Sequence, residues 1–386
     1  MERLRICVVC HPTQGGSGIL ATELGKAMAA RGHQVHFVSH TRPFRLPDDT
    51  PNVHFHKVRI SDYPLFRYPP YSIALAGKLT ELMQEQHFDV LHIHYAIPHA
   101  VSAFLSHEIL KERAPKILVT MHGTDVTVVG AEQELKAVTG FVLGNCDALT
   151  AVSEALKTAS VEVFGLERAI DVIPNFVDIA RFTPAKRSGP GRRALAPHGE
   201  PLIGHMSNFR AVKRVGDVID VFRRVRATLP ARLVLIGDGP MLSEARCRLA
   251  EAGLDGDVME TGAIQNVEDI LPQLDVFLLP SQTESFGLAA LEAMASGVPC
   301  VTTNAGGLPE VIRDGVEGYT RTVGDTAAMA EAVQAILTDA ALHERLGAAA
   351  RTRAETAFAL DKIVDRYEAV YRQLSAASGG GAGPTG

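Results

Sequence analysis

The sequence predicts an α/β protein built from two doubly wound, Rossmann-like domains. Short apolar runs of strand length alternate with helical patterns along the chain, as in repeated β-α-β units. The chain has 386 residues, which is more than a single hydrophobic core usually organises. A stretch rich in proline, glycine and basic residues, 181–200, divides the alternating series and is predicted to be a linker.

The first half, residues 1–180, contains seven predicted strands. Each is a short apolar or alternating run that a loop or a helical pattern follows. The strands are expected at 5–10, 33–39, 53–60, 89–95, 116–122, 148–153 and 171–174. The first helix is expected at 19–31, after a glycine-rich loop that ends at residue 18, and another is expected at 72–86.

The second half, residues 201–360, repeats the alternation. Its strands are expected at 201–208, 232–237, 258–262, 276–279 and 300–303, with a helix at 215–226. Three helical patterns follow, at 327–337, 340–357 and 361–374. The glycine-rich residues 376–386 are predicted to be a disordered tail.

The most informative stretch is residues 278–310. A buried strand ends at Pro280, a polar loop follows, and a helical pattern begins at Leu288 and stops at Gly297. A second strand comes next. The loop therefore lies at the carboxyl end of a strand, where open α/β sheets bind ligands.

Two glutamates frame this β-loop-α-β unit. Glu284 lies in the loop and Glu292 about two helical turns further on, so on the order of 12 Å separates them. Paired carboxylates that act on one glycosidic bond lie only about 5–9.5 Å apart. The spacing therefore favours holding two parts of one long ligand, and the amides of Phe286, Gly287 and Leu288 favour anionic or polar oxygens. The alternative is that both glutamates are ordinary solvated charges.

This string resembles the E-x7-E signature of retaining GT-B glycosyltransferases, including the family's G-x-P at 297–299 and GG-x-P-E at 306–310. The resemblance implies two Rossmann-like domains that face each other across a cleft, with the last helix, 361–374, packing back on the first domain. It also implies that Glu284 contacts the donor sugar and that Glu292 holds the ribose of the nucleotide. Further donor-binding roles are implied for Gly16, Asn208, Ile264, Phe286, Gly287 and Leu288.

The glycine-rich loop after the first strand has three interpretations. Gly16, Gly18 and Ala21 match a relaxed dinucleotide fingerprint, but the acidic residue expected near the end of the second strand is absent. The favoured interpretation is a loop that lets a sugar or a phosphate approach the backbone. A tight turn without any ligand is the third.

Basic residues follow the first strand of the second half. Arg210 and Lys213 precede a predicted helix, and cations beside a helix N-terminus suit a diphosphate, although a solvated basic face is the alternative. The family has an arginine five residues before the lysine, where this chain has Asn208, so Arg210 is displaced by two. Lys213 matches, and the resemblance implies that Lys213 and Arg210 stabilise the leaving diphosphate.

No metal site and no cofactor are predicted. Asp255 and Asp257 form a D-x-D string, but their central glycine indicates a turn. His92 and His94 alternate on one face of a strand and lack a third ligand at a firm spacing. His122 ends a strand, and the resemblance implies that it contacts the 6-hydroxyl of the donor sugar.

Four strings, at 15–33, 94–100, 122–130 and 207–214, resemble a narrower family. These bacterial enzymes transfer N-acetylglucosamine from UDP-N-acetylglucosamine to the hydroxyl of L-malate, the first step of bacillithiol biosynthesis. The resemblance implies those two substrates and front-face transfer with retention, in which the leaving phosphate takes the malate proton and no metal is required.

The acceptor-side motifs contain Ser17, Tyr95 and Thr124, which the resemblance therefore assigns to acceptor binding. A dicarboxylate also requires cations. Lys57, Arg59 and Arg67 are available for that role, and the sequence does not rank them.

Composition limits the partners and the location. The formal net charge of −6 gives no reason to expect nucleic acid, and no run approaches the ~20 uncharged apolar residues of a membrane span. The N-terminus is predicted to be a strand rather than a signal peptide. Five scattered cysteines predict reduced thiols and a cytoplasmic protein. The sequence does not determine the oligomeric state, and a homo-oligomer is among the states it allows.

Three other functions remain as alternatives. The first is a glycosyltransferase for another acceptor, such as an inositol phosphate or a lipid-linked sugar. The second is a sugar-nucleotide epimerase on the same architecture, which needs no separate acceptor. The third is a non-catalytic sensor of sugar nucleotides, against which the intact Glu284, Glu292 and Lys213 argue.

Overall fold

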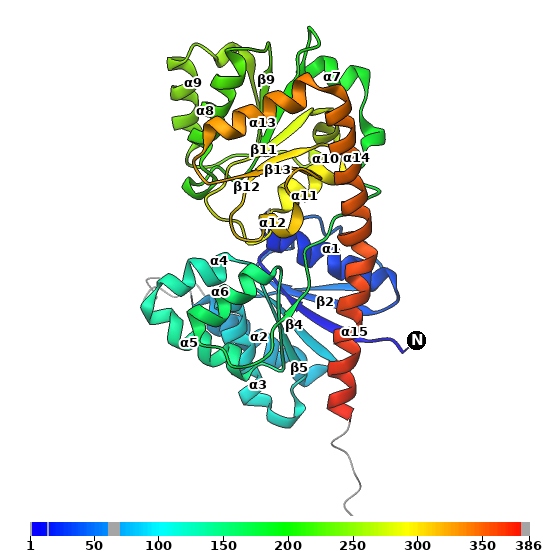
Figure 1. Cartoon of the computed structure of the whole chain (residues 1–386). Helices are drawn as coiled ribbons and strands as arrows, with labels where there is room; N and C mark the ends of the chain where they lie inside the picture. Colours follow the sequence, from blue (N-terminus) through cyan, green and yellow to red (C-terminus); the bar gives the residue numbers. More distant parts are fainter. Residues whose placement is uncertain (1, 14, 61–69, 380–386) are drawn as a thin grey trace, which may run out of the picture. The chain divides into compact units, whose positions relative to one another are not determined.

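The computed structural model describes residues 2–13, 15–60 and 70–379, and the chain divides into two compact units (Figure 1). Unit 1 comprises Met1–Asn175 and Asp361–Gly386, and unit 2 comprises Phe176–Leu360. Each unit contains one parallel sheet with helices. The predicted fold class, two doubly wound α/β domains, is thereby confirmed.

Unit 1 contains a seven-stranded sheet in the order β3-β2-β1-β4-β5-β6-β7, and all of its strand pairings are parallel. Its strands are β1 Arg5–Val9, β2 Gln34–Ser39, β3 Val53–Lys57, β4 Val90–His94, β5 Lys116–Met121, β6 Ala148–Ala151 and β7 Asp171–Val172. The strand order reverses between β1 and β4, and ligands of doubly wound sheets bind beside such a switch point.

The helices of unit 1 follow the strands in alternation. They are α1 Gly16–Ala30, α2 Tyr71–Glu85, α3 Val101–Leu110, α4 Thr124–Thr127, α5 Gln133–Asn145, α6 Glu154–Phe164 and α15 Leu360–Gly379, with short turns η1 Ala96–Ala100, η2 Lys111–Arg113 and η3 Val129–Ala131.

Helix α1 begins earlier than the sequence predicts. Gly16 and Ser17 form its first turn rather than part of the preceding loop. The close packing of this turn on the end of β1 explains the difference, because a Cβ at Gly18 would lie 2.4 Å from the carbonyl oxygen of His11. Glycine at position 18 therefore lets the helix start against the strand end.

The C-terminal helix α15 packs on the sheet of unit 1 (Figure 1). Tyr371 is buried, and its hydroxyl lies 2.6 Å from Nδ1 of His92 in β4. Arg31, just after α1, pairs with Asp365 at 2.7 Å and with Glu368 at 2.9 Å. The helix continues to Gly379, past the expected start of the tail at residue 376, and residues 380–386 lie outside the described residues.

Unit 2 contains a six-stranded sheet in the order β10-β9-β8-β11-β12-β13, again with parallel pairings. Its strands are β8 Leu202–Met206, β9 Arg232–Ile236, β10 Val258–Gly262, β11 Val276–Leu279, β12 Cys300–Thr303 and β13 Gly318–Arg321. The sequence did not predict β13, because this edge strand is short and mostly half-buried and carries no apolar run. Here the switch point lies between β8 and β11.

The helices of unit 2 are α7 Gly189–Leu195, α8 Val215–Arg226, α9 Leu242–Glu251, α10 Val267–Ile270, α11 Leu288–Ala295, α12 Leu308–Val311, α13 Thr326–Thr338 and α14 Ala340–Ala357, with short turns η4 Pro184–Lys186, η5 Ala211–Lys213, η6 Asp255–Asp257 and η7 Leu271–Gln273. Helices α8 and α13 lie side by side (Figure 1), and their apolar faces join β8, β9 and β11 in the core.

The expected linker, residues 181–200, is instead part of unit 2, whose boundary lies at Phe176 rather than near residue 180. Its η4 and α7 segment carries Arg187 and Arg192, which each bind the Asp275 carboxylate at 2.7 Å. Burial raises the pKa of Asp275, but hydrogen bonds from Arg192, the Leu202 amide and Arg187 outweigh it and hold the pKa below its ordinary value. The composition of residues 181–200 predicted a linker because their ionic partner, Asp275, is distant in sequence.

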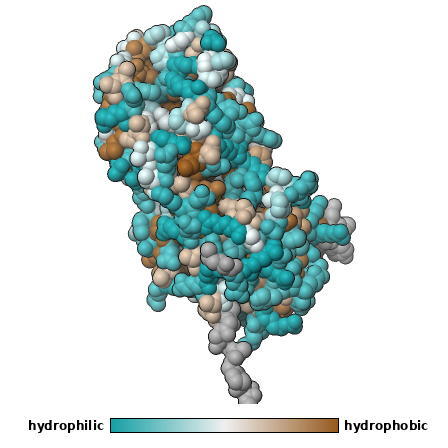
Figure 2. Space-filling model, turned by 90° about the vertical axis from the view of Figure 1, so that its right-hand side faces the viewer, coloured by the Kyte–Doolittle hydropathy of each residue, from teal (hydrophilic) through white to brown (hydrophobic). Residues whose placement is uncertain are grey.

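The surface seen in Figure 2 is largely hydrophilic, with small apolar groups scattered over it. None of the helices in the described part of the chain combines the length and the apolar character that crossing a membrane requires.

Candidate active site

The loops that follow β8 and β11 bring two predicted catalytic residues together in unit 2. Lys213 ends the short turn η5 after β8, and Glu284 lies in the loop after β11. The Lys213 Nζ atom is 2.6 Å from Oε1 of Glu284, and the Ser281 hydroxyl donates to the same oxygen at 2.8 Å. The two charged side chains are only 20% and 11% exposed, so solvent screens this ion pair less than a surface pair.

Backbone contacts hold the Glu284 loop. The amide of Gly307 donates to the carbonyl oxygen of Glu284 at 2.8 Å, and the amide of Gln282 donates to that of Val212 at 2.8 Å. At Gly306 the φ angle is 59°, and a Cβ there would lie 2.1 Å from the Glu284 carbonyl oxygen. The GG-x-P-E string thus allows the loop after β12 to pack against the loop of Glu284.

Helix α11 begins directly after this loop. Gly287 precedes it with φ 101°, and Leu288 is its first residue. The ring of Phe286 is buried against Phe358 at a centroid distance of 5.5 Å. Donor binding by Phe286 would therefore use its backbone amide, since helix N-terminal N–H groups favour anionic oxygens. Glu292 lies in the same helix and is 8% exposed.

The remaining donor-side residues of unit 2 lie in two different loops. Asn208 and Arg210 are exposed in the loop after β8, on either side of the buried Phe209. Ile264 is half-buried after β10, the edge strand. Strand β9 lies between β10 and β8. The loops that carry Ile264 and Lys213 therefore do not follow adjacent strands of the sheet.

In unit 1 the predicted acceptor residues lie at the carboxyl ends of β1, β4 and β5. The Tyr95 and Thr124 hydroxyls share a hydrogen bond, and the His11 ring contacts that of Tyr95 edge-on at 4.9 Å. Ser17 lies in the first turn of α1, after β1.

The candidate cations for the acceptor lie on or after the edge strand of this sheet. Lys57 ends β3, Arg59 follows it, and both are exposed. Arg67 lies outside the described residues.

His122 follows β5, and its Nε2 lies 3.0 Å from Nδ1 of His94. Burial, assisted by the charge of His11, lowers the pKa of His122 to about 3. Burial also places the pKa of His94 well below its ordinary value. Both rings are therefore neutral near pH 7, and His122 would offer a sugar hydroxyl a neutral hydrogen bond. His92 is structural, because it bonds both Tyr371 and Thr120.

Sequence reasoning missed Asp125, although the residue belongs to the HGTD string. Its buried carboxylate accepts hydrogen bonds from the amides of Gly123 at 2.6 Å, His122 at 3.1 Å and Ala96 at 3.1 Å. Burial raises the pKa of Asp125, while these amides oppose the shift. Asp125 therefore fixes the two loops that carry Tyr95, His122 and Thr124.

The D-x-D string has a structural explanation. Asp255–Asp257 form the turn η6, and the Asp257 carboxylate binds Nε of Arg226 at 2.8 Å. Within 2–13, 15–60 and 70–379, no group of three or more His, Cys, Asp or Glu residues is arranged to hold a metal ion.

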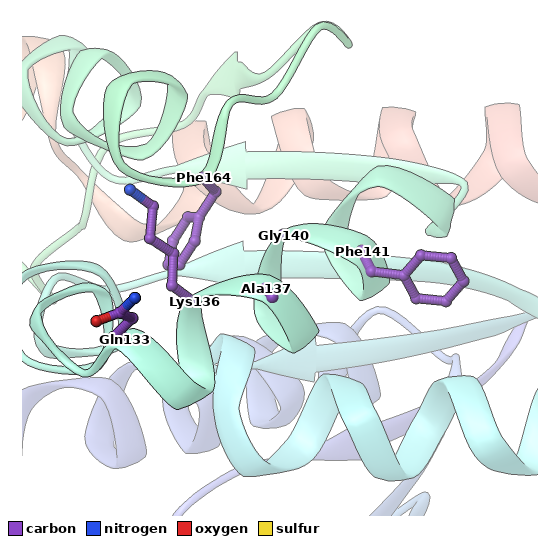
Figure 3. A pocket seen from close by; sticks show the side chains of 6 residues that line it. All are labelled: Gln133, Lys136, Ala137, Gly140, Phe141 and Phe164. Atoms are coloured by element: carbon purple, nitrogen blue, oxygen red, sulfur yellow. The ribbon is translucent and has the colours of Figure 1, made fainter.

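A surface hollow of about 390 Å³ lies elsewhere in unit 1. Figure 3 shows the residues that line it: Gln133, Lys136, Ala137, Gly140 and Phe141 of α5, and Phe164 of α6. None of the predicted site residues lines this hollow, so we do not assign it to the reaction.

Two glycosyltransferase family models match this chain, one in each half. The model of the family "Glycosyltransferase Family 4" matches residues 14–181, and that of "Glycosyl transferases group 1" matches residues 192–353. D-inositol 3-phosphate glycosyltransferase from Geodermatophilus obscurus is 27% identical over 94% of this chain and 87% of its own.

Solved structures share the fold. A glycosyltransferase from Rickettsia africae has a TM-score of 0.83 at 18% identity and covers 97% of this chain and 99% of its own. Sucrose-phosphate synthase from Thermosynechococcus elongatus has a TM-score of 0.78 at 24% identity and covers 97% of this chain and 100% of its own.

Another relative combines higher identity with a match along almost the whole chain. N-acetyl-alpha-D-glucosaminyl L-malate synthase from Bacillus anthracis is 40% identical over 369 residues, 96% of this chain and 97% of the relative. The chain therefore belongs to the family of N-acetyl-alpha-D-glucosaminyl L-malate synthase, within the GT-B glycosyltransferases.

Proposed function

We propose that this glycosyltransferase transfers N-acetylglucosamine from UDP-N-acetylglucosamine to the hydroxyl of L-malate with retention of configuration, the first step of bacillithiol biosynthesis. The observation that carries the proposal is the 40% identity, over 96% of the chain, to an enzyme named for this product. The D-inositol 3-phosphate glycosyltransferase is less similar, at 27%.

Unit 2 would bind the donor. Lys213 and Arg210 supply positive charge after β8, and the first amides of α11 supply N–H donors after β11, as a diphosphate requires. Glu292 would accept hydrogen bonds from the ribose hydroxyls. Glu284 pairs with Lys213, and it would also accept from the hydroxyls of the donor sugar.

Unit 1 would bind the acceptor. The Ser17, Tyr95 and Thr124 hydroxyls lie at strand ends beside the switch point, and they can bind one carboxylate. A cation would hold the second carboxylate. Lys57 and Arg59 are exposed candidates.

The reaction would exchange one bond for another at C1 of the sugar. The bond from C1 to the β-phosphate oxygen breaks, and the malate hydroxyl oxygen bonds C1 on the same face. The departing phosphate takes the hydroxyl proton, so UDP and the glycosylated malate are the products. Lys213 and Arg210 would stabilise the charge that develops on the diphosphate.

The proposal includes no metal and a cytoplasmic location. Lys213 and Arg210 would supply the positive charge that a divalent ion supplies to the diphosphate in other glycosyltransferases. Turnover should persist in excess EDTA, and a loss that Mg²⁺ restores would contradict this part of the proposal. All five cysteines are free thiols, as in proteins of reducing compartments.

The test is to incubate the protein with UDP-N-acetylglucosamine with and without L-malate. We expect UDP release only with malate, and a product whose anomeric coupling in NMR is that of the α-glycoside. An isomerised sugar nucleotide without malate would indicate an epimerase, and a β-linked product would contradict retention.

Competition among acceptors tests the two-carboxylate model. Lactate lacks the second carboxylate, so its kcat/KM should be roughly 30- to 1000-fold lower than that of malate, the effect of about 2–4 kcal/mol from one lost charged contact. Equal use of lactate would contradict the model. Preference for an inositol phosphate would instead indicate the activity for which the D-inositol 3-phosphate glycosyltransferases are named.

A further inference from the structure

We propose that His205 and Ser207 are positioning residues for the donor diphosphate, because they form a hydrogen-bond relay under the loop that carries Lys213. The relay consists of the Phe209 amide, the Ser207 hydroxyl, the His205 ring and the Leu278 carbonyl. The inference rests on the proposed function, since it assigns the effect of the relay to diphosphate binding.

The relay joins the two strands at the switch point of unit 2. His205 lies in β8 and is fully buried. Its Nδ1 is 2.9 Å from the carbonyl oxygen of Leu278 in β11, and its Nε2 is 2.9 Å from Oγ of Ser207. The Ser207 Oγ accepts the amide N–H of Phe209 at 3.1 Å.

The direction of every hydrogen bond in the relay follows from its two ends. The Leu278 carbonyl can only accept, so Nδ1 of His205 carries the proton. Burial, assisted by the charge of Lys213 and opposed by the hydrogen bond to the Leu278 carbonyl, lowers the pKa of His205 to about 4. The ring is therefore neutral near pH 7, and Nε2 carries a lone pair that can only accept. The Ser207 hydroxyl therefore donates to Nε2, and its oxygen remains to accept from Phe209.

The relay supports an unfavourable backbone conformation. Phe209 has φ 40°, in the left-handed region that side chains other than glycine rarely occupy, and its ring is fully buried. The loop also packs closely on the turn after β9. A Cβ at Gly237 would lie 2.0 Å from the Ser207 carbonyl oxygen, and one at Gly239 would lie 2.0 Å from that of Asn208.

The loop held in this way contains the phosphate-binding candidates. The Lys213 amide donates to the Arg210 carbonyl at 2.9 Å, so the turn η5 follows directly from the fixed segment. Removing the Ser207 hydroxyl would leave the Phe209 amide without an acceptor and His205 Nε2 without a donor. The left-handed turn would then lose its support, and Lys213 would be less well placed for a diphosphate.

The test compares UDP with uridine, which lacks the phosphates. In Ser207→Ala, calorimetry should show UDP binding about tenfold weaker, while uridine binding stays within about twofold of the original protein. Ser207→Thr retains the hydroxyl and should restore most of the UDP affinity. Ser207→Cys, whose thiol is a weak acceptor, should be intermediate and is the fallback if Ser207→Ala does not fold.

Ser188→Ala is the matched control in unit 2. The Ser188 hydroxyl also accepts a backbone amide, that of Gly191 at 3.2 Å, but it lies at the start of α7. Its loss should leave UDP affinity unchanged. Equal weakening of uridine and UDP in Ser207→Ala, or equal loss in Ser188→Ala, would overturn the inference.

A double variant separates this inference from the proposed function. If the relay acts through Lys213, then Ser207→Ala combined with Lys213→Ala should bind UDP no more weakly than Lys213→Ala alone. Additive losses would overturn the relay. If Lys213→Ala weakens UDP binding and Ser207→Ala does not, the relay fails and the proposed function stands. If Lys213→Ala itself leaves UDP affinity unchanged, the proposed diphosphate site is wrong.

Discussion

At the residue scale, two of the charged side chains predicted for the donor half, Lys213 and Glu284, are each other's partners. Lys213 is bound to Glu284, which Ser281 also contacts. A phosphate that approaches Lys213 therefore competes with a carboxylate, whereas solvent alone surrounds an ordinary surface lysine. The pairing stabilises a mostly buried cation, because an unpaired buried charge is costly.

Lys213→Ala should lower turnover much more than stability, because its charge is needed most when the diphosphate leaves. Steady-state kinetics and thermal unfolding measure the two effects. Lys186→Ala is the control, since Lys186 also pairs with a carboxylate of unit 2, Asp269 at 3.1 Å, outside the site loops. Turnover within a factor of a few of the original would indicate that the clamp lies elsewhere, with Arg210 the first candidate.

Glu292→Ala should weaken UDP binding, since the ribose hydroxyls would lose a charged acceptor. Each lost charged hydrogen bond costs about 1.5–3 kcal/mol, which titration calorimetry can resolve. Glu331→Ala is the control, because it removes the same negative charge from the exposed face of α13 and should leave UDP affinity unchanged. An unchanged UDP affinity in Glu292→Ala would remove the ribose assignment.

At the scale of elements, the site depends on loops that approach one another at the carboxyl ends of neighbouring strands. The loops after β8, β11 and β12 are linked by backbone hydrogen bonds, from Gln282 to Val212 and from Gly307 to Glu284. The two adjacent glycines of the third loop, Gly306 and Gly307, permit this contact. The same principle applies in unit 1, where Gly18 lets α1 begin against the end of β1.

Gly306→Ala should displace the Glu284 loop and weaken donor binding. Its Cβ would meet the Glu284 carbonyl oxygen at 2.1 Å, in addition to the strain of φ 59°. Gly315→Ala separates the two effects, because Gly315 has φ 75° but open space around the Cβ position. Both variants should lose about 1 kcal/mol of stability or more from strain. Only Gly306→Ala should also bind UDP more weakly in calorimetric titration. Equal UDP affinity of the Gly306→Ala and Gly315→Ala variants would show that the clash is relieved without moving Glu284.

At the scale of the whole molecule, folding buries several histidines in neutral form. Burial lowers the pKa values of His92, His99 and His122 to about 3 and that of His205 to about 4. In the unfolded chain these groups titrate near pH 6.5. Below that pH the unfolded state binds more protons than the folded state, so the free energy of unfolding falls as the pH falls.

The stability that these neutral histidines contribute should therefore be complete above about pH 6.5 and be lost between about pH 6.5 and 3. Each such histidine contributes roughly 1.4 kcal/mol per pH unit within this window. Urea unfolding at pH 7.5, 6.0 and 5.0 measures the slope. His92→Gln, which retains a hydrogen-bonding amide but does not titrate, should reduce the slope by about one proton. An identical slope in that variant would show that His92 stays neutral in both states.

The sequence by itself determined most of the strands and the position of the E-x7-E string within them. Twelve strands were predicted near their observed positions, from Arg5–Val9 to Cys300–Thr303. Short apolar runs, and the glycines and prolines that end them, favour strands and turns through local interactions that the sequence shows directly. Glu284 was placed at a strand's carboxyl end for the same reason. The half-buried edge strand β13 carries no such signal, and it was missed.

Tertiary structure decided which distant residues meet. Lys213 and Glu284 are 71 positions apart, and only the strand order β8-β11 makes them neighbours. The basic segment 181–200 joins unit 2 because its arginines reach Asp275. His205 links β8 to β11 because the Leu278 carbonyl and the Ser207 hydroxyl both lie within hydrogen-bond distance of its ring. Hydrogen-bond partners and burial depend on contacts between elements, and local periodicity carries no information about those contacts.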